Sequence, residues 1–79
     1  MVCIGFQQSF KALSDPTRRE ILRLLRDGPL PAGEIAAQFD MTAATVSHHL
    51  STLRDAGLVL DEKKGKFIYY ELNTSVLDE

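Results

Sequence analysis

The chain has 79 residues, of which 44% are hydrophobic and 25% charged, and this balance predicts one globular domain spanning residues 1–79 and excludes a disordered chain. Its net charge of −2 differs from the basic balance of most nucleic-acid-binding domains, so any phosphate-binding surface must be local. A single cysteine excludes an internal disulfide, and no apolar run reaches the roughly 20 residues that a membrane span needs.

These limits also predict where the protein works and what supports it. The first residues do not resemble a signal peptide, so we expect a cytoplasmic protein with no stable membrane insertion. A domain this small buries a modest fraction of its unfolded surface, so a partner subunit is the expected source of further stability.

The first part of the chain has the apolar periodicity of two helices. The first helix ends before Asp15, and its apolar positions are Val2, Phe6, Phe10 and Leu13. Asp15 is a favoured N-cap and Pro16 a favoured first residue, so the pair predicts the start of a second helix that ends at Gly28 and Pro29. Outside its apolar arc we expect a solvated basic face, made of Arg18, Arg19, Arg23 and Arg26.

Residues 40–57 are the most informative segment of the chain. Thr42 is a suitable N-cap and Gly57 a suitable C-terminal residue, so both ends of a helix are marked. One side of this helix is a predicted buried stripe of Val46, Leu50 and Leu53. The opposite side is polar and nearly free of charge. A short, poorly capped helix after Pro31 precedes it across a tight turn, so the two predict a helix-turn-helix, whose second helix lies in the major groove.

Beyond Gly57 the apolar period changes from 3.6 to 2, which predicts two strands. They cover residues 58–61 and 67–72, and they flank a loop of residues 62–66 with lysines at its tip. Tyr70 is expected to pack in the core, whereas Tyr69 lies on the other face of its strand. Helices followed by a basic hairpin predict a mainly α winged helix-turn-helix with a two-stranded β-hairpin wing.

The outer face of the helix at 42–56 carries side chains suited to DNA. The residues predicted to read bases are Ala44, Thr45, Ser47 and His48. Those predicted to contact phosphates are Thr42, Ser51, Arg54, Lys63, Lys64 and Lys66. For His48 the alternative is an incidental exposed histidine. For the three lysines the alternatives are insertion into the minor groove and a solvated loop. His49 borders the buried stripe and is expected to be a hydrogen-bonded packing residue.

Other chemistry is not indicated by the sequence. His48 and His49 are about 100° apart around a helix, so they cannot grip one metal ion as residues four apart can. No nucleophile, base and orienting acid can be placed together, which predicts a protein that is not an enzyme. We therefore expect no metal and no cofactor. Cys3 is interpreted as an incidental thiol, with a redox switch as the alternative.

Three segments together carry a family resemblance. They are FKALSDPTRREILRLL, TAATVSHHLSTLRDAGLV and DEKKGKFIYYELN, in this order and spacing. With them the chain resembles the ArsR/SmtB family of bacterial winged-helix repressors, and most closely its non-metal, SdpR-like autorepressor branch. The cysteine-rich motif of the family's arsenic and cadmium sensors would align near Pro31 and Gly33, which cannot bind a soft metal ion. The ligands that zinc sensors carry on their last helix have no counterpart in residues 74–79.

The resemblance implies a function and an assembly. It implies a homodimeric repressor that binds double-stranded DNA at an imperfect inverted repeat overlapping its own promoter. The recognition helix would run from Thr42 to Ala56 and the wing from Asp61 to Lys66. The dimer interface would use the first helix and a C-terminal helix, through Val2, Ile4, Phe6, Phe10, Val76 and Leu77. Release from DNA would involve a regulatory protein partner in the membrane.

A second class of function stays open from the sequence. A winged helix can serve as a protein-interaction module, such as an antirepressor or a complex subunit, without direct DNA readout. The outer face of the helix at 42–56 discriminates between the two. A protein-binding version would expose large apolar groups there, whereas a DNA-binding version would expose small and polar ones.

Overall fold

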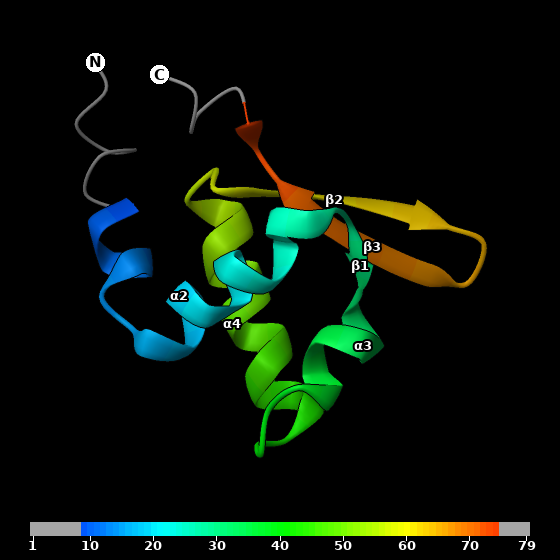
Figure 1. The fold of residues 1–79 in the computed structure, drawn as a ribbon, viewed down its shortest axis with the longest axis horizontal. Coiled ribbons are helices and arrows are strands. Elements are labelled where there is room, and N and C mark those ends of the chain that lie inside the picture. The colour runs from blue at the N-terminus through cyan, green and yellow to red at the C-terminus, as the bar shows by residue number, and fades with distance from the viewer. Residues whose placement is uncertain (1–8, 75–79) are drawn as a thin grey trace.

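Helices occupy most of the chain up to Asp55, and an antiparallel hairpin follows them (Figure 1). The computed structural model describes residues 9–74, of which residues 9–13 are helical. The later elements, in chain order, are α2 (Pro16–Leu24), the 3-10 helix η1 (Leu25–Asp27), β1 (Leu30–Pro31), α3 (Ala32–Ala37), α4 (Ala43–Asp55), β2 (Val59–Lys64) and β3 (Phe67–Leu72). Within residues 9–74, every helix is too short or too polar to cross a bilayer.

The core lies where α2, α3 and α4 meet the inner face of the hairpin. Its largest fully buried side chains are Ile21, Ile35, Val46, Leu50, Leu53 and Val59. Tyr70 of β3 is only 7% exposed and closes the core from the side of the sheet. Tyr69 alternates to the other face of β3, as predicted. The predicted stripe on the fourth helix is confirmed, because all three of its residues are buried.

The start of α2 is fixed by its cap. The carboxylate of Asp15 accepts hydrogen bonds from the backbone amides of Thr17, at 2.7 Å, and Arg18, at 3.2 Å. Pro16 occupies the first turn, where its missing N–H costs nothing. The predicted cap and first residue are both confirmed. By contrast, α3 begins after Pro31 with no side-chain cap, as its sequence indicated.

Both ends of α4 follow the sequence signals. The Thr42 hydroxyl accepts a hydrogen bond from the Thr45 amide at 3.1 Å. At the other end Gly57 has a φ of +79°, the left-handed conformation that favours glycine. Its amide donates to the carbonyl of Arg54 at 2.9 Å, and the Leu58 amide donates to that of Leu53 at 3.0 Å. These two bonds form a Schellman motif, which turns the chain directly into β2.

Replacing the cap at Asp15 should lower the thermal unfolding midpoint at pH 7, because two amides lose their acceptor in Asp15→Ala. Desolvation alone raises the pKa of Asp15, but hydrogen bonds from the Arg18 and Thr17 amides outweigh it and hold that pKa below 3.8. A depressed pKa means that the carboxylate stabilises the fold above its ordinary pKa, and that this contribution is lost as the pH falls through the folded-state value.

Circular dichroism melts at several pH values check this expectation. The difference in midpoint between wild type and Asp15→Ala should be full at pH 7 and should shrink once the pH falls below about 3.8. Asp40→Ala is the matched control, since Asp40 is exposed and lies between helices. An equal loss of stability in both variants would contradict a capping role for Asp15.

The hairpin is longer and its loop shorter than the sequence indicated. β2 pairs with β3 in antiparallel register from Val59 with Leu72 to Lys64 with Phe67. The prediction of a loop over residues 62–66 was wrong, because the turn consists of Gly65 and Lys66 alone. Gly65 has a φ of +63°, which permits a two-residue turn of the II′ kind and brings residues 62–64 into the ladder.

The sheet contains a third strand, which the sequence did not predict. β1 pairs antiparallel with β3, with Leu30 opposite Tyr70 and Pro31 opposite Tyr69, so the strand order is β1-β3-β2. Two residues are too few to show a period, and a proline argues against a strand. At the edge of a sheet, however, the missing N–H of Pro31 removes no ladder hydrogen bond. The strand anchors the base of the wing to the start of α3.

Most of the predicted dimer interface lies outside the described residues. These positions are Val2, Ile4, Phe6, Val76 and Leu77, and Cys3 lies outside them as well. Phe10 is described, and 65% of its surface is exposed. An aromatic ring with this exposure on a short helix is compatible with a contact to another subunit.

Candidate nucleic-acid interface

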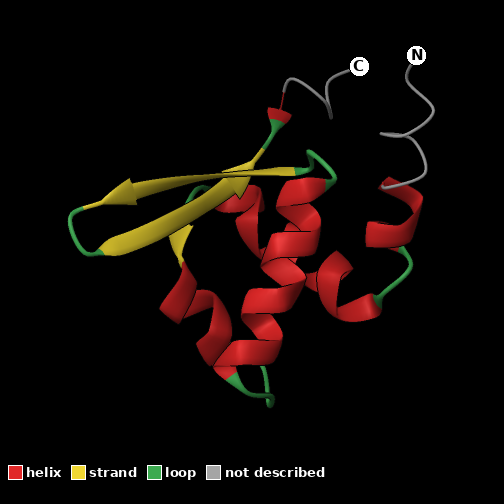
Figure 2. Cartoon of the chain, turned by 180° about the vertical axis from the view of Figure 1, so that it is seen from behind, coloured by secondary structure: helices red, strands yellow, loops and turns green. Residues whose placement is uncertain are grey.

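The outer face of α4 is exposed, small and polar. Ala44, Thr45, Ser47 and His48 are all exposed, and Ser51 is partly exposed. The large apolar side chains exposed within residues 9–74 all lie outside α4; they are Phe10, Leu13, Met41, Leu60, Phe67 and Ile68. In both views α4 runs between the hairpin on one side and the helix of residues 9–13 on the other (Figures 1 and 2). The face is therefore bordered on both flanks.

The hydroxyls of Thr42 and Thr45 are hydrogen-bonded to each other at the N-terminal end of this face. The Thr42 hydroxyl accepts from the Thr45 amide and donates to the Thr45 hydroxyl at 2.9 Å. Its hydrogen is thus used inside the protein, and Thr42 acts mainly as a cap. The Thr45 hydroxyl accepts that bond, so its own hydrogen is available for an outside acceptor. Ser47 and His48 have no side-chain hydrogen-bond partner within residues 9–74.

The two adjacent histidines have different surroundings. His48 is exposed, whereas His49 is half-buried with its Nδ1 3.1 Å from the Nη1 of Arg18. A guanidinium can only donate, so the Nδ1 of His49 is the acceptor in this contact. The prediction of His49 as a hydrogen-bonded packing residue is confirmed. The ring centroids of the two histidines are 6.1 Å apart and the ring planes are tilted by 53°, so the rings are not stacked in parallel.

Arg18 does not belong to a solvated basic face, and this prediction was wrong. Its Nε donates to the carbonyl of Ala12 at 2.8 Å, and its Nη2 donates to that of Lys11 at 2.9 Å. With the contact to His49, one guanidinium joins the helix of residues 9–13 to α2 and α4. The last carbonyls of a helix need outside donors, but sequence alone does not say which side chain reaches them.

The wing lysines are distributed over two faces and the turn, not gathered at one tip. Lys66 lies in the turn, and its Nζ is 5.8 Å from the centroid of the Phe67 ring. Lys64 is on the outer face of β2, with its Nζ 5.4 Å from the centroid of the Tyr69 ring. Lys63 alternates to the inner face, which it shares with Asp61 and Tyr70. Lys63 therefore projects on the side of the hairpin that meets α4.

Arg54 pairs with two carboxylates of the protein itself. Its Nη1 donates to the Oδ2 of Asp61 at 3.3 Å, and its Nη2 lies 3.5 Å from the Oδ1 of Asp55. The hydrogen bond to Asp61 and the charge of Asp55 raise the pKa of Arg54. Asp61 belongs to β2, so this contact links the end of α4 to the wing. The sequence did not predict this contact, because Arg54 lies on a helix and Asp61 on a strand, and neither the helical nor the strand periodicity relates the two residues.

Among residues 9–74 no group of three or more histidine, cysteine or acidic side chains is arranged to hold an ion. The hydrogen-bond donors and acceptors of the α4 face are instead dispersed along two turns of the helix. Dispersed donors suit a long polymer surface better than one small ligand.

The fold and this face define a winged helix-turn-helix protein: α3 and α4 form the two-helix motif, and β2 and β3 form the wing. Residues 15–60 match the family model described as bacterial regulatory protein, arsR family. The match covers more than half of the chain, so the chain belongs to the arsR family of bacterial regulatory proteins. This is a family of regulators and not of enzymes.

Individual relatives agree with this family. The chain is 53% identical over 70 residues to the transcriptional repressor SdpR of Bacillus subtilis, covering 89% of this chain and 78% of SdpR. It is 38% identical over 68 residues to the arsenic resistance transcriptional regulator ArsR1 of Pseudomonas putida, covering 85% of this chain but only 53% of ArsR1. The chain thus spans about half the length of ArsR1.

A solved structure extends the similarity to the fold. The solution structure of the homodimeric winged helix-turn-helix DNA-binding domain Mb0332 of Mycobacterium bovis superposes with a TM-score of 0.88 at 29% identity. The alignment covers 96% of this chain and 70% of that one. The predicted fold class is confirmed, with the short strand β1 as an addition.

Proposed function

We propose that residues 1–79 form one DNA-binding domain, which acts as a homodimeric, sequence-specific transcriptional repressor on double-stranded DNA in the cytoplasm. The observation that carries the proposal is the face of α4, where the exposed donor groups of Thr45, Ser47 and His48 have no hydrogen-bond acceptor within residues 9–74. Relatives described as repressors, SdpR among them, support repression of transcription rather than activation.

The N-terminal half of α4 is the part that enters the major groove in this proposal. Its first turn contains no acidic residue, so the positive end of the helix dipole faces the phosphates unopposed. Ala44 permits close approach, and the hydroxyls of Thr45 and Ser47 donate to base acceptors together with His48. Asp55 lies at the far end of the helix, where repulsion from the DNA backbone is smallest.

Phosphate contacts are assigned to the wing and to the border of the α4 face. Lys63, Lys64 and Lys66 supply the charge, and Ser51 adds a hydroxyl beside the groove. Thr42 contributes through its cap, since it orients the Thr45 hydroxyl. Binding should therefore weaken steeply with salt, despite the net charge of −2.

Arg54 is expected to contribute little to phosphate binding, because Asp55 and Asp61 already offset its charge. Arg54→Ala should change the slope of log K against log salt by less than half of the change caused by Lys63→Ala. Exposed ion pairs contribute little to stability, so only a small loss of stability is also expected. Equal changes of slope in the two variants would instead show that Arg54 contacts a phosphate.

The dimer is the second part of the proposal. The first helix and the C-terminal segment would form the interface, with Val2, Ile4, Phe6, Phe10, Val76 and Leu77. Two copies of α4 related by a two-fold axis would then read an inverted repeat, and autoregulation would place it at the protein's own promoter. Mb0332, which is described as homodimeric, has the same fold and supports this assembly. A regulatory protein partner stays a prediction from the family resemblance.

Selection of bound duplexes from a random DNA pool, with the mass of the complex measured, tests the proposal. We expect an enriched inverted repeat and a complex with two protein chains per duplex. A pool that stays unenriched, with no complex at low salt, would overturn DNA binding and favour the protein-interaction module. The absence of large exposed apolar side chains on α4 already argues against that module.

A further inference from the structure

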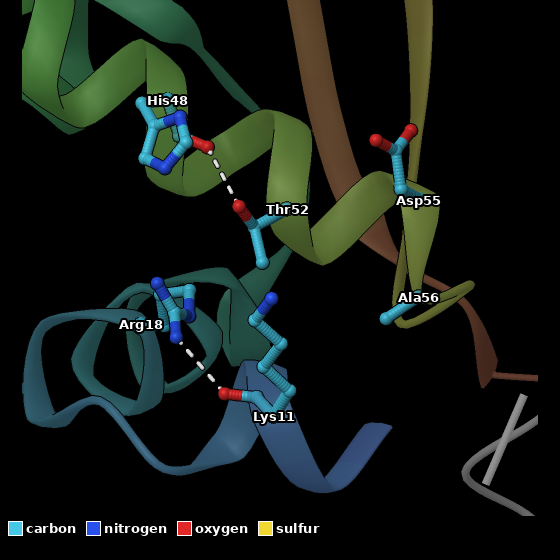
Figure 3. A pocket seen from close by; sticks show the side chains of 6 residues that line it. All are labelled: Lys11, Arg18, His48, Thr52, Asp55 and Ala56. Atoms are coloured by element: carbon cyan, nitrogen blue, oxygen red, sulfur yellow. Dashed lines mark hydrogen bonds between the residues drawn. The ribbon is translucent and has the colours of Figure 1, made fainter. Parts of the chain in front are cut away.

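A hollow of about 270 Å³ lies beside α4 on the flank opposite the wing. Its lining consists of Lys11, Arg18, His48, Thr52, Asp55 and Ala56 (Figure 3). His48 belongs to both this lining and the face proposed to read DNA. The hollow therefore continues that face toward the helix of residues 9–13, and the proposed function so far assigns it no role.

Only one cation in the hollow is available to an outside ligand. The guanidinium of Arg18 is occupied by the carbonyls of Lys11 and Ala12 and by His49. The ammonium of Lys11 has no hydrogen-bond or ion-pair partner within residues 9–74. Figure 3 shows its side chain extending toward α4 beside Thr52.

The acidic group of the hollow does not neutralise Lys11. The carboxylate of Asp55 lies 3.5 Å from the Nη2 of Arg54, and no ion pair joins it to Lys11. In Figure 3 this carboxylate points away from the lysine. The Thr52 hydroxyl donates to the His48 carbonyl at 3.1 Å and so is satisfied within the helix. A single positive charge is thus directed into an open hollow.

The position of Lys11 relative to α4 is fixed by packing and by Arg18. Ala12, the next residue, is fully buried in the core. Arg18 binds the carbonyls of both residues and reaches His49 on α4. The backbone from which the Lys11 side chain extends is therefore held against the recognition helix, and little ordering of the chain is needed when an anion binds.

The dimensions of DNA indicate that the anion bound by Lys11 is a backbone phosphate. A helix with its side chains is about 10–12 Å across, and the major groove is about 12 Å wide, so a helix in the groove has a phosphate backbone on each flank. The hairpin that carries the wing lysines lies on one flank of α4, and the helix of residues 9–13, to which Lys11 belongs, lies on the other (Figures 1 and 2).

We propose that Lys11 contacts a DNA phosphate on the flank of α4 opposite the wing, so that the duplex is held from both sides of the recognition helix. The inference rests on the proposed function, namely DNA binding by α4. It adds a residue on the helix of residues 9–13 to the DNA interface, and it makes the hollow the seat of one phosphodiester group. Arg18 is the positioning residue that holds Lys11 in place.

The first test is the salt dependence of binding by Lys11→Gln, with the selected operator and a random duplex as probes. One phosphate contact contributes about 0.9 to the slope of log K against log salt, which is roughly eightfold in affinity at 0.1 M relative to 1 M salt. We expect the slope to fall by about 0.9 per protomer and both DNAs to lose affinity about equally. Arg26→Gln, which removes an exposed cation in η1, is the matched control and should leave the slope unchanged.

The second test locates the phosphate. Single phosphates of the operator are replaced by neutral methylphosphonates, and each substitution is combined with Lys11→Gln. At the phosphate that Lys11 contacts, the affinity lost through the methylphosphonate and the affinity lost through Lys11→Gln should not be additive. This phosphate should lie on one DNA strand, and the phosphates that show the same non-additivity with wing variants should lie on the backbone across the major groove. Full additivity at every phosphate, with the slope unchanged, would overturn the role of Lys11. If the wild type does not bind either DNA, it is the proposed function that fails.

Discussion

Replacing Lys63, Lys64 and Lys66 together with alanine should lower the slope of log K against log salt by about 2.7 per protomer, since each lost phosphate contact removes about 0.9. At 0.1 M salt this corresponds to a loss of roughly 500-fold in affinity per protomer. The net charge of the chain is −2, and three of its lysines are clustered within residues 63–66 of the wing. Affinity therefore depends on these three residues more than on any others.

Fluorescence anisotropy with a labelled operator and a random duplex, at several salt concentrations, measures this effect. The loss should be nearly equal for the two DNAs, because phosphates carry no sequence information. The cation–π contacts of Lys64 with Tyr69 and of Lys66 with Phe67 are worth roughly 0.5–1 kcal/mol each, too little to keep the lysines from phosphates. A triple variant with the wild-type slope would show that the wing stays in solvent.

The single variants refine this picture because β2 separates the lysines. Lys63 lies on the face of the hairpin that meets α4, and Lys64 lies on the outer face over Tyr69. Lys64→Ala should weaken binding to all sequences about equally. The arrangement was not visible in the sequence, where the three lysines were expected at the tip of one loop.

The local features of the fold were predictable because their causes are local. The caps at Asp15 and Thr42 and the left-handed Gly57 depend on neighbours within a few residues, and the sequence placed them correctly. The buried stripe of α4 follows from the helical period alone. In each case the residue type and the spacing determine the structure together.

The errors arose where distant residues decide the structure. Residues 62–64 of β2 are charged and have no strand propensity of their own, and they become a strand because β3 pairs with them. β1 exists only through its pairing with β3. Arg18 and His49 are 31 residues apart, so no period relates them. The hollow beside Lys11 depends on that contact and could not be located from sequence.

Removing the two hydroxyls of the recognition helix, in the double variant Thr45→Val and Ser47→Ala, should reduce specificity rather than general affinity. Each lost hydrogen bond costs roughly 1 kcal/mol, or about fivefold, so the ratio of operator to random-DNA affinity should fall by about 25-fold per protomer. Thr45→Val keeps the methyl group, and the Thr42 cap still accepts from the backbone amide of residue 45. The helix should therefore keep its stability.

Thr52→Val is the matched control, because the Thr52 hydroxyl lies on the same helix but is bonded to the His48 carbonyl. Competition of labelled operator against unlabelled random duplex gives the ratio directly, and a thermal melt confirms that each variant folds. Because the Thr45 hydroxyl accepts from Thr42, its own hydrogen is left for a base acceptor, so Thr45 should account for at least half of the loss. Equal losses on operator and random DNA would mean that these hydroxyls contact phosphates, and base reading would then have to come from His48 and the shape of the DNA.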